Sequence, residues 1–93
     1  MVELIAWPAM VNCRTVPASS EPVAVATCLA AVQARFGQGV RMEIAEVVRF
    51  DGVDHVNVRG FADSATVNYG WVCKVRNGLL MGDLLILPRK FRP

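Results

Sequence analysis

Apolar side chains recur every three or four positions between residues 22 and 36, which is the spacing of an amphipathic helix. Ser20 stands where it can cap this helix, with Glu21 and Pro22 in the first turn, and Gly37 stands where the helix would end. We therefore expect one helix over this stretch. The apolar positions that define it are Val25, Cys28, Leu29, Val32 and Phe36.

The other side of the predicted helix carries alanines in place of charges. No charged residue occurs between Glu21 and Arg35, although an exposed helix normally carries charge on its outer side. We therefore expect this side to be covered as well, either by a curved sheet or by a second subunit. The alanines are Ala24, Ala26, Ala30, Ala31 and Ala34.

Alternating apolar and polar residues predict strands in much of the remaining chain. A first strand is expected over residues 2–7, ended by Pro8, and a loop over residues 15–20. The later strands form two hairpins, because Asp51-Gly52 and Asn77-Gly78 are typical of two-residue type I′ turns. These four strands are expected at about 40–50, 53–61, 66–76 and 79–87.

The order of elements is therefore β-α-β-β-β-β. It predicts an α+β fold in which a single helix packs across a curved antiparallel sheet, a two-layer sandwich. On this order and the two turn dipeptides, the chain resembles the cystatin-like wrap, and its last four strands resemble the half-cone sheet of nuclear-transport-factor-like proteins. Ninety-three residues suit one domain spanning 1–93, with a basic tail at 88–93 that we expect to be frayed.

The first predicted hairpin has one mixed, polar face. If residues 51–52 form a two-residue loop, Phe50 lies opposite Val53, and four polar side chains share one face of the two strands. The other face pairs Arg49 with Asp54 at the turn and is otherwise apolar, so we expect it to belong to the core. The four polar residues are Glu46, His55, Asn57 and Arg59.

This polar face is a candidate catalytic or ligand-binding site. A carboxylate beside an imidazole orients it and can make it a proton carrier, so Glu46 and His55 are the candidate catalytic pair. Arg59 would hold an anionic group, and Asn57 would orient a ligand. The alternative interpretation is that these are solvated side chains making ordinary cross-strand pairs, or that a one-residue bulge separates them.

The second predicted hairpin has a core face and an unusually apolar outer face. Contiguous apolar exposure of this kind is typical of protein interfaces, although burial under the N-terminal segment is an equal alternative. The expected core residues are Val67, Tyr69, Trp71, Cys73, Val75, Leu80, Leu84 and Ile86. The candidate interface residues are Leu79, Met81, Leu85 and Leu87.

Three cysteines, Cys13, Cys28 and Cys73, are widely spaced and odd in number. We expect reduced thiols inside the core of a cytoplasmic protein. A zinc site built from them and His55 would have no ligand pair close in sequence, so we predict no metal and no cofactor. The sequence shows no signal-peptide pattern and no apolar run long enough to cross a bilayer, so we expect no membrane association.

Composition favours a protein partner. Apolar types make up 54% of the chain and charged types 19%, which is more apolar surface than one small copy is expected to bury. The net charge of +2 is weak for a nucleic-acid binder, and the tail at 88–93 is the only basic stretch.

These features favour a non-enzymatic protein-binding module that forms a homodimer through the surface of its sheet. Such a module would be an adaptor or a small inhibitor, for example one carried on a mobile element. The first alternative is a small-ligand-binding or proton-transfer enzyme built around His55. The second, a nucleic-acid accessory protein acting through the basic tail, is the weaker one. The sequence contains no nucleophile-elbow, zinc-protease, phosphate-loop or dinucleotide motif.

Overall fold

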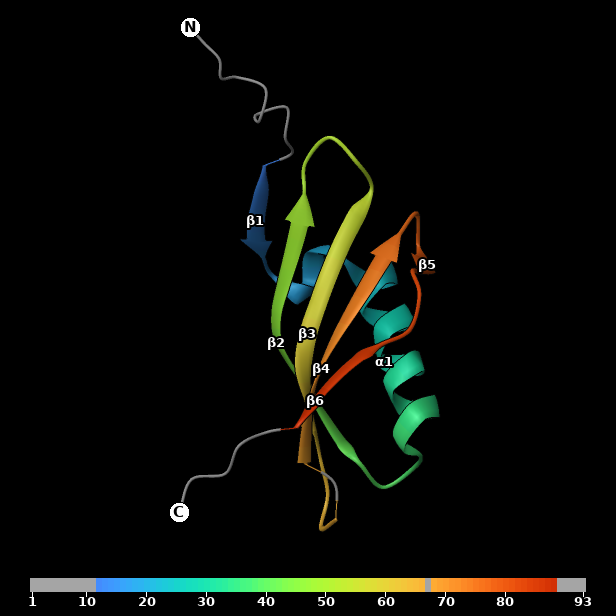
Figure 1. Cartoon of the computed structure of the whole chain (residues 1–93). Helices are drawn as coiled ribbons and strands as arrows, with labels where there is room; N and C mark the ends of the chain where they lie inside the picture. Colours follow the sequence, from blue (N-terminus) through green and yellow to red (C-terminus); the bar gives the residue numbers. More distant parts are fainter. Residues whose placement is uncertain (1–11, 67, 89–93) are drawn as a thin grey trace, which may run out of the picture.

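A computed structural model describes residues 12–66 and 68–88 of the chain (Figure 1). One helix packs on a curved antiparallel sheet, which confirms the predicted α+β, two-layer fold class. The predicted fourth strand of the hairpin region is divided into two short strands. In chain order the elements are β1 (Cys13–Val16), the 3-10 turn η2 (Ala18–Ser20), α1 (Pro22–Phe36), β2 (Arg41–Phe50), β3 (His55–Asp63), β4 (Asn68–Arg76), β5 (Leu79–Leu80) and β6 (Leu85–Pro88).

The sheet has the order β1-β2-β3-β4-β5, and β6 pairs with the earlier half of β4. Helix α1 lies across one face of the sheet, against β3, β4 and β5, and we call this the helix face (Figure 1). Within residues 12–66 and 68–88, no helix or strand lies over the opposite face, which we call the open face. Side chains alternate between the two faces along each strand.

The core lies between α1 and the helix face. Trp71, the largest fully buried side chain, packs against Gly60 on the neighbouring strand. A side chain at Gly60 would overlap the carbonyl oxygen of Glu43 and would reach within 2.6 Å of the indole, so only glycine fits there. The buried apolar residues are Ala24, Cys28, Val32, Val47, Val56, Val58, Ala62, Trp71, Cys73 and Val75.

A disulfide joins Cys28 of α1 to Cys73 of β4 across the two layers. Both residues are fully buried, and they stand 45 positions apart in the chain. The prediction of reduced thiols is therefore wrong for this pair, because the fold brings together two cysteines that nothing in the local sequence connects. Cys13 is a free, exposed cysteine on β1 and is not part of the core.

The residue that caps the start of helix α1 is one position later than the predicted cap, Ser20. Glu21 is the capping position, Pro22 follows it in the first turn as predicted, and the Ser20 hydroxyl donates instead to the carbonyl of Pro17 at 2.8 Å. Gly37 ends the helix with a positive φ of 88°, as predicted. Ala26, Ala30 and Ala34 are exposed, so the described part of the chain does not cover that side of the helix.

The first hairpin turns over four residues, 51–54, and the predicted two-residue loop is wrong. Phe50 pairs with His55, not with Val53. A type I′ turn needs positive φ at both central residues, and here only Gly52 has it. The partner of each β2 residue on β3 is therefore two positions later than predicted. Because side chains alternate with a period of two, each one keeps its predicted face as far as a bulge between Ile44 and Glu46. Beyond the bulge, Met42 and Ile44 pack against the core.

The second hairpin has the predicted two-residue turn, with Arg76 opposite Leu79. Both turn residues, Asn77 and Gly78, have positive φ. The returning strand is interrupted after Leu80 and resumes at β6, again displaced by two positions, which leaves the two faces as predicted. Trp71, Cys73 and Val75 are buried as predicted and Leu84 and Ile86 pack against the core, but Tyr69 and Leu80 are 37% and 39% exposed.

The second half of strand β1, Thr15 and Val16, lies in the region predicted to be a loop, and β1 forms the edge of the sheet by pairing with β2. Its Arg14 donates to Asp51 of the first hairpin at 3.1 Å, a contact between residues far apart in sequence. The strand predicted at residues 2–7, the core position Val67 and the basic residues of the tail lie outside the described residues.

Candidate functional site

The open face brings all four predicted polar site residues onto one surface, but it divides them into two pairs. Glu46 lies opposite Arg59, and His55 lies opposite Phe50, four residue pairs further along the strands. The predicted register, with Phe50 opposite Val53, would place His55 opposite Val48 and next to Glu46. This pairing is wrong, and so is the direct neighbourhood of Glu46 and His55 that depended on it.

Glu46 is engaged on both of its oxygens. The Arg59 Nε donates to Oε1 at 2.9 Å, and the Thr15 hydroxyl on β1 donates to Oε2 at 3.4 Å. The carboxylate thus neutralises a guanidinium and connects three strands. Since Glu46 lies four residue pairs away from His55 along the strands, it does not act here as the base that orients His55.

His55 contacts Asn57 and Phe50 instead. Its Nε2 stands 2.9 Å from the Asn57 Oδ1, and its ring is tilted against that of Phe50, with centroids 4.8 Å apart. With Nε2 donating to the amide oxygen, the other ring nitrogen faces away from Asn57. This arrangement fixes the orientation of a half-buried imidazole, as a structural histidine requires.

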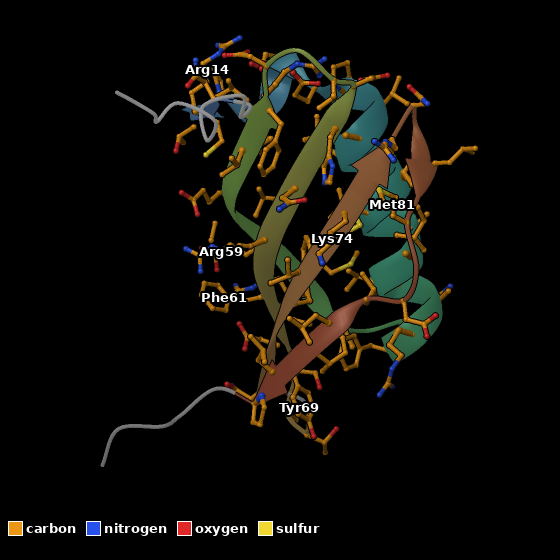
Figure 2. All side chains as sticks on the ribbon, turned by 45° about the horizontal axis from the view of Figure 1, so that its top comes forward. Arg14, Arg59, Phe61, Tyr69, Lys74 and Met81 are labelled. Carbon is orange, nitrogen blue, oxygen red and sulfur yellow. A yellow bond between two sulfur atoms is a disulfide. The ribbon has the colours of Figure 1, made fainter. Side chains whose placement is uncertain are left out.

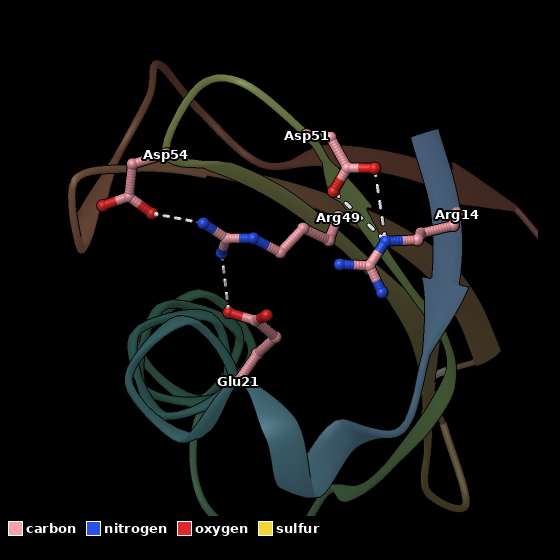
Figure 3. Close-up of polar contacts among 5 residues, drawn as sticks. All are labelled: Arg14, Glu21, Arg49, Asp51 and Asp54. Carbon is pink, nitrogen blue, oxygen red and sulfur yellow. Dashed lines mark hydrogen bonds and ion pairs between the residues drawn. The ribbon is translucent and has the colours of Figure 1, made fainter. Parts of the chain in front are cut away.

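Ion pairs hold the end of the sheet that carries the first hairpin (Figure 3). Arg49 donates to Glu21 at the start of α1 at 3.0 Å and to Asp54 at 3.3 Å, and Asp54 is the partner predicted from the sequence. Arg14 donates to Asp51. These contacts connect β1, α1 and the hairpin, and they give this end of the molecule a structural role.

The predicted interface residues lie on the open face at its β5–β6 side. The side chains of Leu79, Leu85 and Leu87 are 71%, 52% and 46% exposed. Met81, labelled with Lys74 in Figure 2, is half-buried. Its backbone N–H donates to the carbonyl of Lys74 at 2.8 Å. Val72, which lies opposite Leu85, extends the same apolar surface. These five residues follow the same side of the open face along β4, β5 and β6, and we call them the leucine patch.

A small depression, which the strand pattern did not predict, lies beside the leucine patch. It has a volume of about 200 Å³, and Arg59, Phe61, Val72 and Leu87 surround it. Its floor is Gly70, which lies opposite Phe61 and carries no side chain to fill the space. We call it the Gly70 socket. A glycine inside a predicted strand was the available signal, because such residues often mark a place of close approach.

A second, larger groove runs between the last turns of α1 and the connection from β5 to β6. Its volume is about 600 Å³, and it is mainly apolar. Asp83, which the strand alternation would place on the outer face of the second hairpin, lies here beside Arg35 and Leu84, because the chain leaves β4 after Leu80. The side chains of Ala31 and Ala34 are small, so they leave the space of the groove unfilled.

Within residues 12–66 and 68–88, no three His, Cys, Asp or Glu side chains are grouped so as to hold a metal ion. Cys28 and Cys73 are bonded to each other and are not thiolate ligands. No helix in these ranges is long and apolar enough to span a bilayer.

Comparison with known proteins adds no assignment. No protein family model matches the chain, and no curated protein or solved structure is significantly similar to it. The surfaces described above are therefore the features of the molecule that point to a function.

Proposed function

We propose that this protein is a non-enzymatic protein-binding module, an adaptor or small inhibitor, that forms a homodimer through the open face of its sheet. The observation that carries the proposal is the leucine patch. Three of its leucines expose about half or more of their side chains on a sheet face that no described element covers. A contiguous apolar surface of this kind is unfavourable in water and is typical of interfaces.

The architecture favours a second copy as the first partner. Open sheet faces pack on each other about 10 Å apart, with side chains from both sheets filling the space between them. A stable homodimer buries roughly 1,200–2,000 Å² in total, and the two open faces offer an extended, slightly curved surface to supply that area. Polar residues such as Glu46, Arg59 and Asn57 flank the patch, as in the rim of an interface.

Sedimentation equilibrium of the full chain at micromolar concentration tests this proposal. We expect twice the monomer mass of 10.2 kDa. Leu85→Asp should convert the dimer to monomer, because it places a charge at the centre of the patch. Val23→Asp is the matched control, since Val23 is 63% exposed but lies on α1, away from the open face. A wild-type monomer at these concentrations would refute the proposal.

The alternatives drawn from the sequence are weaker. A proton-transfer enzyme around His55 would lose its predicted carboxylate partner, since Glu46 is bonded to Arg59. His55 itself lines neither the Gly70 socket nor the groove beside α1. The basic tail that would support a nucleic-acid role lies outside the described residues.

The cellular location belongs to the proposal as well. The cytoplasmic prediction depended on reduced thiols, and a buried Cys28–Cys73 bond argues instead for an oxidising compartment, where disulfides persist. Thiol titration of the denatured, unreduced protein checks this point. One reactive thiol, from Cys13, is expected; three would restore the cytoplasmic interpretation.

A further inference from the structure

The Gly70 socket is shaped to receive one apolar side chain. Its volume of about 200 Å³ equals that of roughly six or seven water molecules, enough for a branched aliphatic group. The ring of Phe61 and the side chains of Val72 and Leu87 give it apolar walls. Arg59 stands at its rim and is held there by the bond to Glu46.

Leu79 is the side chain of this molecule best suited to fill such a socket. It is 71% exposed, the highest value among the large exposed apolar residues of the described chain. It stands at the start of β5, opposite Arg76, and follows the rigid two-residue turn at Asn77-Gly78. A leucine in this position is presented on a fixed backbone and pays little conformational entropy on docking.

We propose that, in the homodimer, Leu79 of each copy inserts into the Gly70 socket of the other, with the two open faces stacked and their strands running in opposite directions. This inference rests on the proposed function. Arg76, the neighbour of Leu79, and Gly70 stand six positions apart on β4, which corresponds to about 20 Å. A two-fold axis that crosses β4 midway, between Lys74 and Val72, exchanges the two positions and makes both contacts at once.

Charge supports the reversed direction. The hairpin end of the open face carries Lys74 and Arg76, which would lie level with their own copies if the two sheets ran in the same direction. The far end of the face carries Glu43 and Asp63 beside Arg41 and is slightly acidic, while the neutral Glu46–Arg59 pair is level with Val72, near the axis. Reversed stacking places the basic end of one copy over the acidic end of the other.

Two complementary variants test the arrangement. Leu79→Ala removes the inserted side chain, and Gly70→Leu fills the socket. Gly70 accepts a side chain without strain, because a Cβ there would meet its nearest neighbours at ordinary distances of 3.7–3.8 Å. Leu80→Ala is the matched control, since Leu80 is next in sequence but lines the groove beside α1. Circular dichroism and thermal unfolding verify that each variant is folded.

Each of the two variants should raise the dimer Kd at least tenfold in sedimentation velocity, and Leu80→Ala should leave it unchanged. In an equimolar mixture, the Gly70→Leu copy can insert its Leu79 into the intact socket of the Leu79→Ala copy, while the alanine faces the filled socket. Native mass spectrometry should therefore show the heterodimer well above the statistical half of all dimers. A statistical mixture, or a Leu79→Ala dimer of wild-type strength, would overturn this arrangement while leaving the homodimer standing. A wild-type monomer would overturn both.

Discussion

At the scale of single residues, Trp71 and Tyr69 show how neighbouring positions of one strand differ in their contribution. Both were predicted to be core residues. Trp71 is 1% exposed and packs on Gly60, where nothing larger than glycine fits. Tyr69 is 37% exposed and stacks on Phe36 at the end of α1, with ring centroids 5.7 Å apart. Alternation along a strand identifies the face of a residue but does not tell whether the opposing layer reaches that far.

The two aromatic residues should therefore differ in a stability measurement. Trp71→Ala removes a buried aromatic side chain and leaves a cavity, so the free energy of unfolding should fall by about 3–5 kcal/mol. Tyr69→Ala removes an exposed stacked ring, and the loss should be about 1 kcal/mol. Urea denaturation followed by circular dichroism compares the two. Equal losses would contradict the burial described for β4.

At the scale of elements, the sequence predicted the types of element and the two faces of each hairpin better than it predicted the pairing. The turn at Asn77-Gly78 was predicted correctly, because asparagine and glycine both tolerate the positive φ that a type I′ turn requires. The turn after Phe50 was not, because Asp51 is held by contacts from outside the hairpin. Its N–H donates to the carbonyl of Asn12, and its carboxylate accepts from Arg14. Such distant contacts leave no local signal.

The prediction of the candidate site was affected by the same error in strand pairing. Four polar residues were correctly assigned to one face, because a displacement by two positions preserves alternation. The same displacement separated Glu46 from His55 and removed the predicted catalytic pair. The disulfide between α1 and β4 could not be foreseen either, since the separation of 45 residues gives no spacing pattern to recognise.

This disulfide is the covalent connection between the two layers, and its loss should destabilise the fold. Closing a loop of 45 residues removes chain entropy from the unfolded state, a contribution of about 4 kcal/mol at 25 °C. Besides the fully buried residues of α1, Val25, Leu29 and Phe36 pack partly against the core, and the disulfide adds to these contacts between the layers. Reduction, or Cys28→Ser with Cys73→Ser, should lower the free energy of unfolding by about that amount in urea. Cys13→Ser, at the exposed free cysteine, is the control and should have no effect.

At the scale of the whole molecule, two layers must stabilise a chain that is 54% apolar. One side of the sheet is covered by a single helix of 15 residues, and the other side carries the leucine patch, over which no helix or strand of the described residues lies. The exposed alanines of α1 add a second apolar surface. A second copy on the open face converts two layers into four and buries the larger of these surfaces, so folding and association are expected to support each other.

This coupling predicts that thermal stability depends on protein concentration. For a folded dimer that unfolds to two chains, each tenfold rise in concentration adds about 1.4 kcal/mol per mole of dimer to the free energy of unfolding. The Tm of the wild-type chain should therefore rise by a few degrees for each tenfold step between micromolar and millimolar concentrations. Leu85→Asp, which blocks the open face, should unfold at a lower Tm that is independent of concentration, because its monomer gains nothing from association. Calorimetry at three protein concentrations measures both Tm values. If the Tm of the wild-type chain and that of Leu85→Asp depended on concentration in the same way, the open face would be stable in water without a partner.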